Sequence, residues 1–246
     1  MRGSMSDRLT WLGHATVLLE LGGARIVTDP VLRPRVAHLL REVPMPGDVG
    51  PLDAILVSHG HHDHLDLPTL RGLDPSAPVL APPDAAWALR RGGHPVHTMV
   101  PGDELEVAGV RVSAVPAAHD GRRVPFGHAP SAVGFVASGV YFAGDTEPYP
   151  GMAALAGMLD AALLPVAGWG PKVGPGHMDP RGAAEALTLL RPALAIPIHW
   201  GTYRRIGHRT VGDPAREFTE HAARLAPDVR IVVLAPGDAV GITRAV

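Results

Sequence analysis

A histidine-rich loop constrains what this chain can fold into more than any other stretch of its sequence. Four histidines and two aspartates fall within residues 59–66, directly after the apolar run 54–57. The apolar run predicts a short buried strand, and Gly60 lets the backbone turn sharply at its end. Ligands delivered by one loop at a strand end are already positioned, so a metal ion binds there with little further ordering. Neutral imidazoles and a carboxylate at this spacing suit zinc or a similar divalent ion.

The alternative interpretation of this loop is a polar surface segment in which histidines cluster by chance, because the chain contains 14 of them. Three later residues of metal-binding type argue against chance, since each follows a predicted strand. They are His119, Asp145 and His199. The carboxyl ends of strands are where layered α/β folds usually place their sites. The repeated context therefore favours a metal site.

The order of these residues resembles the metallo-β-lactamase superfamily. Its motif reads here as His59-x-His61-x-Asp63-His64, followed by His119, Asp145 and His199. Two flanking segments are similar to one branch of the superfamily. They are Gly13-His14-Ala15-Thr16 and Ile196-Pro197-Ile198-His199-Trp200-Gly201-Thr202. That branch includes N-acyl-phosphatidylethanolamine phospholipase D and ascorbate-6-phosphate lactonase. The motif is specific for the superfamily and says little about the substrate.

The resemblance implies an α+β protein with a four-layer αββα sandwich and a site at one edge, between the sheets. It implies two Zn²⁺ ions as cofactors, with Mn²⁺ or Fe²⁺ as alternatives. The implied ligands are His59, His61 and His119 for one ion, Asp63, His64 and His199 for the other, and Asp145 as the bridge. Asp29 is expected to orient the histidine loop from behind, as carboxylates commonly do. Its alternative is a turn at the end of a strand.

The predicted reaction is hydrolysis by a metal-bridging hydroxide, without a covalent enzyme intermediate. A phosphodiester is the favoured substrate, because two metals stabilise the charge on a phosphoryl group. A lactone or another carboxylic ester is the alternative. The catalytic candidates are Asp63, Asp145 and His177, and the candidate substrate contacts are Arg122, Arg123 and Tyr203.

Two of these assignments rest on the chemistry of single side chains. His177 follows a Gly- and Pro-rich loop and precedes a predicted helix. A similar His-x-Asp-Pro in the phospholipase-like branch implies that His177 stands at the rim of the metal pocket, where an imidazole is suited to protonate a leaving group. The alternative is a structural histidine that bonds a loop carbonyl. Arg122 and Arg123 can form bidentate hydrogen bonds with a phosphate or carboxylate of the substrate. The alternative interpretation is that both are solvated surface residues.

Other classes of function fit the sequence less well. The commonest zinc β-lactamases carry a cysteine at the position of Asp145, and this chain has no cysteine, so β-lactams are not the expected substrate. A non-enzymatic metal-binding protein is a second hypothesis, but the complete ligand set argues against it. A nuclease is a third, and the formal net charge of −2 argues against binding nucleic acid.

Composition bounds the organisation of the chain. Its 246 residues, 46% of them hydrophobic, can bury one core. Residues 1–4 resemble an expression leader, and residues 5–246 are expected to form a single hydrolase domain. No apolar run approaches the roughly 18 residues that span a membrane. Without a signal segment or cysteine, a cytoplasmic protein with a small-molecule ester substrate is expected, and its oligomeric state stays open.

Hydrophobic patterning and turn residues predict the remaining elements. Residues 31–51 are expected to form a long loop that covers the site, and Trp87 is expected to pack within a helix. Capped helices are predicted after Asp179-Pro180 and Asp213-Pro214, ending near residues 190 and 225. Shorter helices are expected over 67–73 and 152–157. The predicted strands are 9–13, 16–21, 24–28, 104–107, 110–115, 131–136, 140–143, 161–166, 193–198, 230–234 and 239–243.

Overall fold

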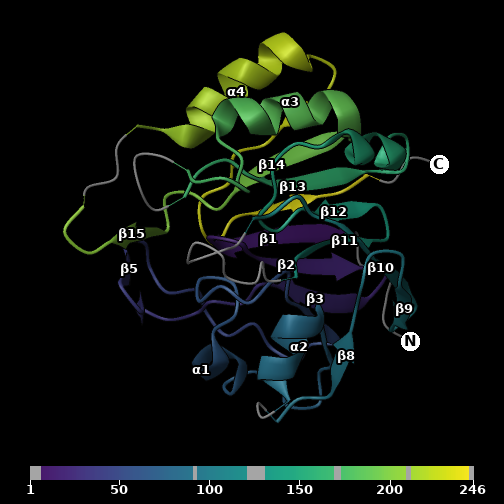
Figure 1. The fold of residues 1–246 in the computed structure, drawn as a ribbon, viewed down its shortest axis with the longest axis vertical. Helices are drawn as coiled ribbons and strands as arrows, with labels where there is room; N and C mark the ends of the chain where they lie inside the picture. Colours follow the sequence, from purple (N-terminus) through teal and green to yellow (C-terminus); the bar gives the residue numbers. More distant parts are fainter. Residues whose placement is uncertain (1–6, 91–92, 121–130, 169–172, 209–211, 244–246) are drawn as a thin grey trace.

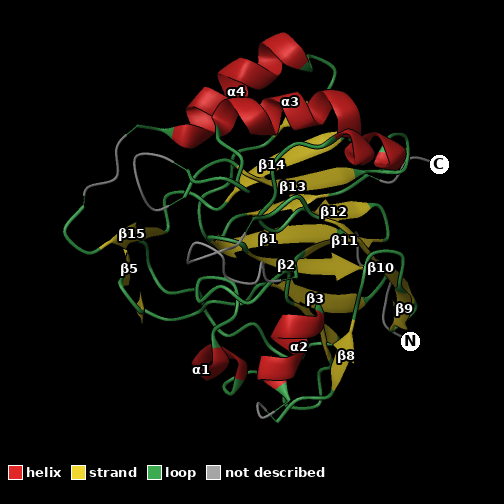
Figure 2. Ribbon diagram, in the orientation of Figure 1, coloured by secondary structure: helices red, strands yellow, loops and turns green. Residues whose placement is uncertain are grey.

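Two β-sheets face each other, and helices cover the outer face of each (Figure 1). This computed structural model describes residues 7–90, 93–120, 131–168, 173–208 and 212–243. Figure 2 shows the order of the layers, with α3 and α4 above one sheet and α1 and α2 below the other. The predicted four-layer αββα sandwich is confirmed. None of the helices in the described ranges is long and apolar enough to cross a membrane.

The first sheet carries the histidine loop. Its strand order is β17-β1-β2-β3-β6-β7-β8, with β1 to β3 antiparallel and β3, β6, β7 and β8 parallel. Because the parallel strands run the same way, the residues that follow β3 and β6 meet at one edge. The strands are β1 (Arg8–Gly13), β2 (Thr16–Leu21), β3 (Ala24–Thr28), β6 (Ala54–Leu56), β7 (Val79–Ala81), β8 (Val96–Thr98) and β17 (Ala239–Gly241).

The second sheet carries the later candidate ligands. Its order is β16-β14-β13-β12-β11-β10-β9, and β12, β13, β14 and β16 are parallel. The residues that follow β12 and β14 therefore also reach one common edge. The strands are β9 (Glu104–Val107), β10 (Val110–Pro116), β11 (Val133–Ala137), β12 (Val140–Phe142), β13 (Ala161–Pro165), β14 (Leu194–Ile198) and β16 (Arg230–Ile231).

The helices pack their apolar faces on the outer sides of the sheets. Helices α1 (Leu67–Leu70) and α2 (Pro83–Leu89) cover the first sheet. Helices α3 (Pro180–Leu190) and α4 (Pro214–Leu225) and the 3₁₀ helix η1 (Pro150–Leu155) flank the second. Both predicted caps are present, because Asp179 accepts the N–H of Gly182 and Asp213 accepts that of Arg216.

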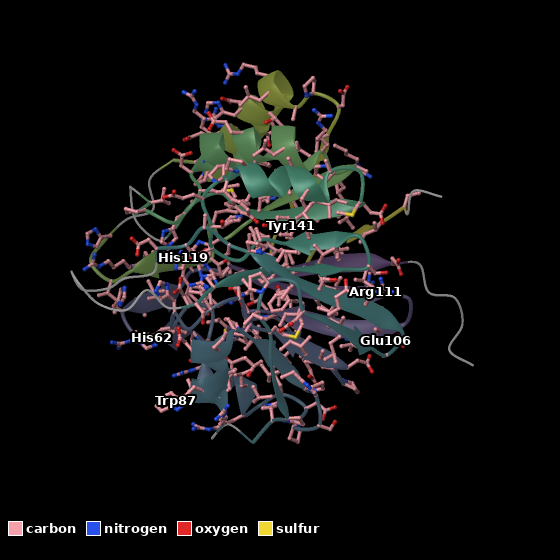
Figure 3. All side chains as sticks on the ribbon, turned by 45° about the vertical axis from the view of Figure 1, so that its right-hand side comes forward. His62, Trp87, Glu106, Arg111, His119 and Tyr141 are labelled. Carbon is pink, nitrogen blue, oxygen red and sulfur yellow. The ribbon has the colours of Figure 1, made fainter. Side chains whose placement is uncertain are left out.

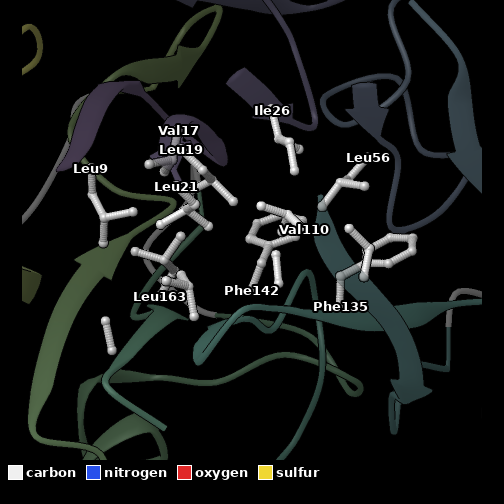
Figure 4. Packing of buried hydrophobic residues seen from close by; sticks show 14 of the residues in the cluster. Leu9, Val17, Leu19, Leu21, Ile26, Leu56, Val110, Phe135, Phe142 and Leu163 are labelled. Carbon is white, nitrogen blue, oxygen red and sulfur yellow. The ribbon is translucent and has the colours of Figure 1, made fainter. Parts of the chain in front are cut away.

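Apolar side chains fill the space between the two sheets (Figure 4). Leu19 and Ile26 from the first sheet pack in one cluster with Phe135, Phe142 and Leu163 from the second, and all five are fully buried. Removing one such side chain from water stabilises the fold by about 1.5–3 kcal/mol. This core fixes the two sheets against each other, and with them the strand ends that carry the site.

A third sheet replaces part of the predicted loop 31–51. Strands β4 (Arg35–Val36) and β5 (Leu39–Arg41) pair with each other, and β5 pairs with β15 (Tyr203–Arg205). Two or three residues are too few to give an alternating pattern, and their pairing partner lies far along the chain. The expectation of a structureless loop was therefore wrong for these residues.

The packing role predicted for Trp87 was wrong as well. Its side chain lies on the outer face of α2 and the residue is 71% exposed. The face of α2 that meets the sheet is formed by Ala85, Ala86 and Leu89, which are buried. The helix therefore uses its small residues for close packing and leaves the largest side chain in solvent.

Candidate metal centre

The candidate ligands gather at one end of the sandwich. They follow β6, β10, β12 and β14, so both sheets contribute to the same edge. Figure 3 shows His119 and His62 at this end of the molecule, and Arg111 and Glu106 at the opposite end. His62 is exposed, whereas His59 and His64 on the same loop are fully buried.

Two clusters of four potential ligands form here, with the ligand atoms of each cluster within 4.8 Å of one another. The first cluster, His59, His61, His119 and Asp145, contains the residues that sequence reasoning grouped around one ion. The second cluster is His14, Asp63, His64 and His199. It contains the three residues expected around the other ion, together with His14, which sequence reasoning did not place in the site.

His119 and His199 each turn one ring nitrogen toward the protein. Nδ1 of His119 lies 2.8 Å from the carbonyl oxygen of Gly176, and Nδ1 of His199 lies 2.7 Å from that of Ala167. A carbonyl oxygen only accepts, so each Nδ1 carries the hydrogen and donates it. In the neutral imidazole Nε2 then presents a lone pair, which is the form that binds a metal ion.

Asp29 orients the histidine loop from behind. Its carboxylate accepts the Ser58 N–H at 2.7 Å, the Ser58 hydroxyl at 2.5 Å and His64 Nδ1 at 2.6 Å. Because the hydroxyl hydrogen points at Asp29, Ser58 Oγ accepts from His59 Nδ1, 2.9 Å away. Burial raises the pKa of Asp29, while His64 and Ser58 oppose the shift. The Nε2 atoms of His59 and His64 therefore both point into the site. Burial would lower the pKa of His64, but Asp145, Asp63 and Asp29 outweigh it and hold the pKa well above its usual range, so a metal ion would take the place of a proton on His64 Nε2.

The buried donor atoms fit a metal ion. His64 Nε2 lies 3.1 Å from His199 Nε2, although both rings already donate through Nδ1. Two lone pairs that face each other at this distance need a cation or a proton between them. In addition, His59 Nε2, His119 Nε2 and Asp145 Oδ1 are buried without a hydrogen-bond partner among the described residues. Buried polar atoms are normally satisfied, and divalent ions bound to these atoms would satisfy them.

Asp145 belongs to the first cluster and also faces histidines of the second. Its Oδ2 is 3.7 Å from His59 Nε2 and 3.1 Å from His64 Nε2, and its Oδ1 is 3.5 Å from His199 Nε2. Burial alone would raise the pKa of Asp145, but His199 and His64 outweigh it and hold the pKa well below its usual range. An ionised carboxylate therefore faces histidines of both clusters.

Two glycines allow the strand ends to approach this closely. Gly144 has a φ of +60°, and a Cβ there would lie 2.5 Å from the Ser58 Cβ. Gly176 has a φ of +80°, and a Cβ there would lie 2.5 Å from the backbone nitrogen of Asp120 and 3.0 Å from His119 Nδ1. Any side chain at these positions would displace the groups that orient His59 and His119.

His14 is the site residue that sequence reasoning missed. Its Nε2 lies 3.1 Å from Asp63 Oδ2, and its ring centroid lies 3.9 Å from that of His199. Burial and the neighbouring His199 lower the pKa of His14 to about 4, so the imidazole is neutral near pH 7. The motif Gly13-His14-Ala15-Thr16 was noted in the sequence, but the motif alone does not show that the His14 ring lies in the site.

His177 stands at the rim. Its Nε2 lies 3.3 Å from Asp145 Oδ2, and its Nδ1 lies 3.0 Å from the Pro175 carbonyl oxygen. Both neighbours are acceptors, so this position suits a ring with hydrogens on both nitrogens. Burial lowers the pKa of His177, but Asp145 acts in the opposite direction and the pKa is raised overall. The side chain is 25% exposed, so it borders both the buried ligands and solvent.

Of the three candidate substrate contacts, only Tyr203 lies within the described residues. The Tyr203 hydroxyl donates toward the Arg33 carbonyl at 2.7 Å, and the Tyr203 ring meets the His14 ring edge-on at 5.5 Å between centroids. Its hydroxyl is therefore used within the fold, and substrate contact stays a prediction. Arg122 and Arg123 lie outside the described residues.

Comparisons with known proteins agree with this fold and site. A family described as "Beta-lactamase superfamily domain" matches residues 24–200. A UPF0173 metal-dependent hydrolase of Methanopyrus kandleri is 35% identical, covering 94% of this chain and 98% of that protein. Another, from Opitutus terrae, is 33% identical, covering 96% of this chain and all of that protein. The chain therefore belongs to the β-lactamase superfamily and, within it, to the UPF0173 metal-dependent hydrolases.

A solved structure supports the fold independently. The novel metallo hydrolase from the hyperthermophilic archaeon Ignicoccus hospitalis has a TM-score of 0.73 at 23% identity, covering 98% of this chain and 100% of that one. At this identity the likeness supports the fold alone. The superfamily predicted from the motif is confirmed, whereas the phospholipase and lactonase branch stays a prediction.

Proposed function

We propose that this metal-dependent hydrolase binds two divalent ions and cleaves phosphodiesters. The observation that carries the proposal is Asp145, whose carboxylate faces histidines of both clusters. Zn²⁺ is the proposed metal, with Mn²⁺ or Fe²⁺ as alternatives, because imidazole and carboxylate donors suit all three. The proposed ligands are His59, His61 and His119 for one ion, Asp63, His64 and His199 for the other, and Asp145 for both. Two such ions supply an activated water and stabilise the attacking and departing oxygens.

Charge favours an anionic substrate. The pKa of Asp63 is held well below its usual range although burial opposes this, because His64 and His14 stabilise the ionised form. Asp63 and Asp145 therefore bring two negative charges to the proposed ligands, while two divalent ions bring four positive ones. With the hydroxide of the predicted reaction counted as one more negative charge, the loaded site would still be net positive, and a positive site attracts a phosphodiester more strongly than a neutral lactone.

The position of His177 supports a role in protonating the leaving group. It lies at the rim, and its Nε2 faces the Asp145 carboxylate at 3.3 Å. A surface hollow of about 630 Å³ adjoins it, lined in part by Glu147, Met178 and Arg181. A leaving group that occupied this hollow would lie beside the imidazole. We assign His177 the donation of a proton to the departing alkoxide oxygen.

A panel of chromogenic substrates tests the proposed function. A phosphodiester, a phosphotriester, a lactone and a β-lactam would be assayed with purified protein, before and after chelation and after Zn²⁺ is restored. We expect the phosphodiester to be cleaved fastest, and we expect chelation to abolish and Zn²⁺ to restore its cleavage. His62→Ala serves as the control, because His62 is an exposed histidine of the same loop.

Each outcome of the panel separates one alternative. Faster cleavage of the lactone would replace the phosphodiester by the carboxylic-ester alternative. Strong β-lactam cleavage would contradict the substrate preference drawn from the branch resemblance and from the absence of a cysteine at position 145. Retained metal without cleavage of any ester would favour the non-enzymatic hypothesis.

A further inference from the structure

We infer that His14 is a positioning residue, which holds Asp63 and His199 in the arrangement that binds the second ion. The inference rests on the proposed function, since it concerns one of the two proposed metal-binding clusters. His14 is buried, with 2% of its surface exposed, and it belongs to the turn between β1 and β2. It therefore reaches the site from the first sheet, while His199 reaches it from the second.

The ring of His14 forms a hydrogen bond with the Asp63 carboxylate. Nε2 of His14 lies 3.1 Å from Asp63 Oδ2, and the same oxygen lies 3.5 Å from His199 Nε2. An ionised carboxylate only accepts hydrogen bonds, so His14 Nε2 carries the hydrogen and donates it. A protonated nitrogen has no lone pair for a metal ion. His14 therefore differs from His59, His64, His119 and His199, each of which donates through Nδ1 to a group of the protein and turns Nε2 toward the site.

The backbone of His14 forms a hydrogen bond with the backbone of His199. The carbonyl oxygen of His14 accepts the His199 N–H at 2.9 Å and the Trp11 indole N–H at 2.9 Å. The His14 N–H donates to Thr202 Oγ1 at 2.7 Å. One residue thus ties the β1–β2 turn to the segment that follows β14, and places the His199 ring beside its own.

The local conformation indicates that the surroundings hold His14 in place. Its φ is +54°, and that of His199 is +63°, so both residues lie in the left-handed region that costs energy for a side chain with a Cβ. Tyr203 meets the His14 ring edge-on at 5.5 Å, which limits its rotation. Backbone strain of this kind persists only where neighbouring contacts fix the residue.

Four substitutions separate positioning from other roles. His14→Asn is the main variant, because asparagine tolerates the left-handed region but is too short to reach Asp63. His14→Gln places an N–H at a reach similar to that of Nε2, and His14→Met has the same length without a donor. His62→Asn is the matched control, since it alters an exposed histidine of the metal loop.

The measurement is metal binding by metal-free protein. Zn²⁺ affinity would be followed by competition with a chromophoric chelator, and the ligand environment by the visible spectrum of the Co²⁺ form. For His14→Asn and His14→Met we expect one of two ions to bind about 10–100-fold more weakly, the usual effect of removing a group that orients a ligand. We expect His14→Gln to restore most of the affinity with a wild-type Co²⁺ spectrum, and His62→Asn to behave as wild type.

Three results would overturn the inference. Wild-type affinity for both ions in His14→Asn and His14→Met would show that His14 does not position the site. A changed Co²⁺ spectrum in His14→Gln would make His14 a ligand instead. If wild-type protein binds no second ion, the proposed dinuclear site fails as well, so the two failures are distinguishable. Should His14→Asn not fold as metal-free protein, the comparison of His14→Gln with His14→Met decides the question.

Discussion

Replacing Gly144 by alanine should destabilise the fold and loosen the metal site together. A Cβ at Gly144 would lie 2.5 Å from Ser58 Cβ and 2.8 Å from Ser58 Oγ, at a φ of +60°. The left-handed conformation costs a residue with a Cβ about 1–2 kcal/mol. The overlap with Ser58 adds about 1–3 kcal/mol, the typical cost of overpacking. Together they predict a loss of about 2–5 kcal/mol in the free energy of unfolding.

Two control glycines divide this loss into its parts. Gly109 has a φ of +85°, but a Cβ there meets no described atom within 4 Å, so Gly109→Ala should show the conformational cost alone. Gly47 lies outside the left-handed region and is equally open, so Gly47→Ala should change stability by less than about 1 kcal/mol. The three variants would be compared by equilibrium unfolding in urea, as metal-free proteins.

The functional consequence is measured in the same variants. Ser58 donates to Asp29 and accepts from His59, so displacing it should weaken Zn²⁺ binding by about 10–100-fold in Gly144→Ala. Gly109→Ala and Gly47→Ala should keep wild-type affinity. The reasoning is refuted if Gly144→Ala is no less stable than Gly109→Ala, or if its Zn²⁺ affinity is unchanged.

Two further substitutions test the chemistry. Asp145→Ala should lower phosphodiester cleavage by far more than about tenfold, or about 1.4 kcal/mol of barrier, because it removes the carboxylate that faces histidines of both clusters. Cleavage within that limit would show that Asp145 is not the bridge. His177→Ala should keep both ions but cleave substrates with poor leaving groups roughly 10²–10⁴-fold more slowly, as measured by steady-state rates. A substrate with an activated leaving group needs no proton, so its cleavage rate should fall much less. Equal losses of rate on both kinds of substrate would exclude His177 as the acid.

Much of the scaffold could be predicted because its signals are local. The helix that begins at Pro180 is predicted by Asp179, whose side chain accepts the N–H of Gly182, three residues further along the chain. The motif around His59 likewise predicts ligand identities, because the turn after β6 delivers them from one short segment.

The rest depends on contacts that are distant in sequence. Strand β15 pairs with β5 across more than 160 residues, and neither strand is long enough to show a pattern. The orientation of His119 depends on the Gly176 carbonyl, which is 57 positions away along the chain. The place of His14 depends on Asp63 and on the segment after β14, which no local rule joins.

Metal content tests the central claim most directly. Protein purified without exposure to chelators would be analysed for its elements, with protein concentration determined independently. Two clusters of ligands, with the Asp145 carboxylate of the first facing histidines of the second, predict close to two divalent ions per chain, with Zn²⁺ as the main metal. One ion per chain, or none, would contradict the dinuclear site.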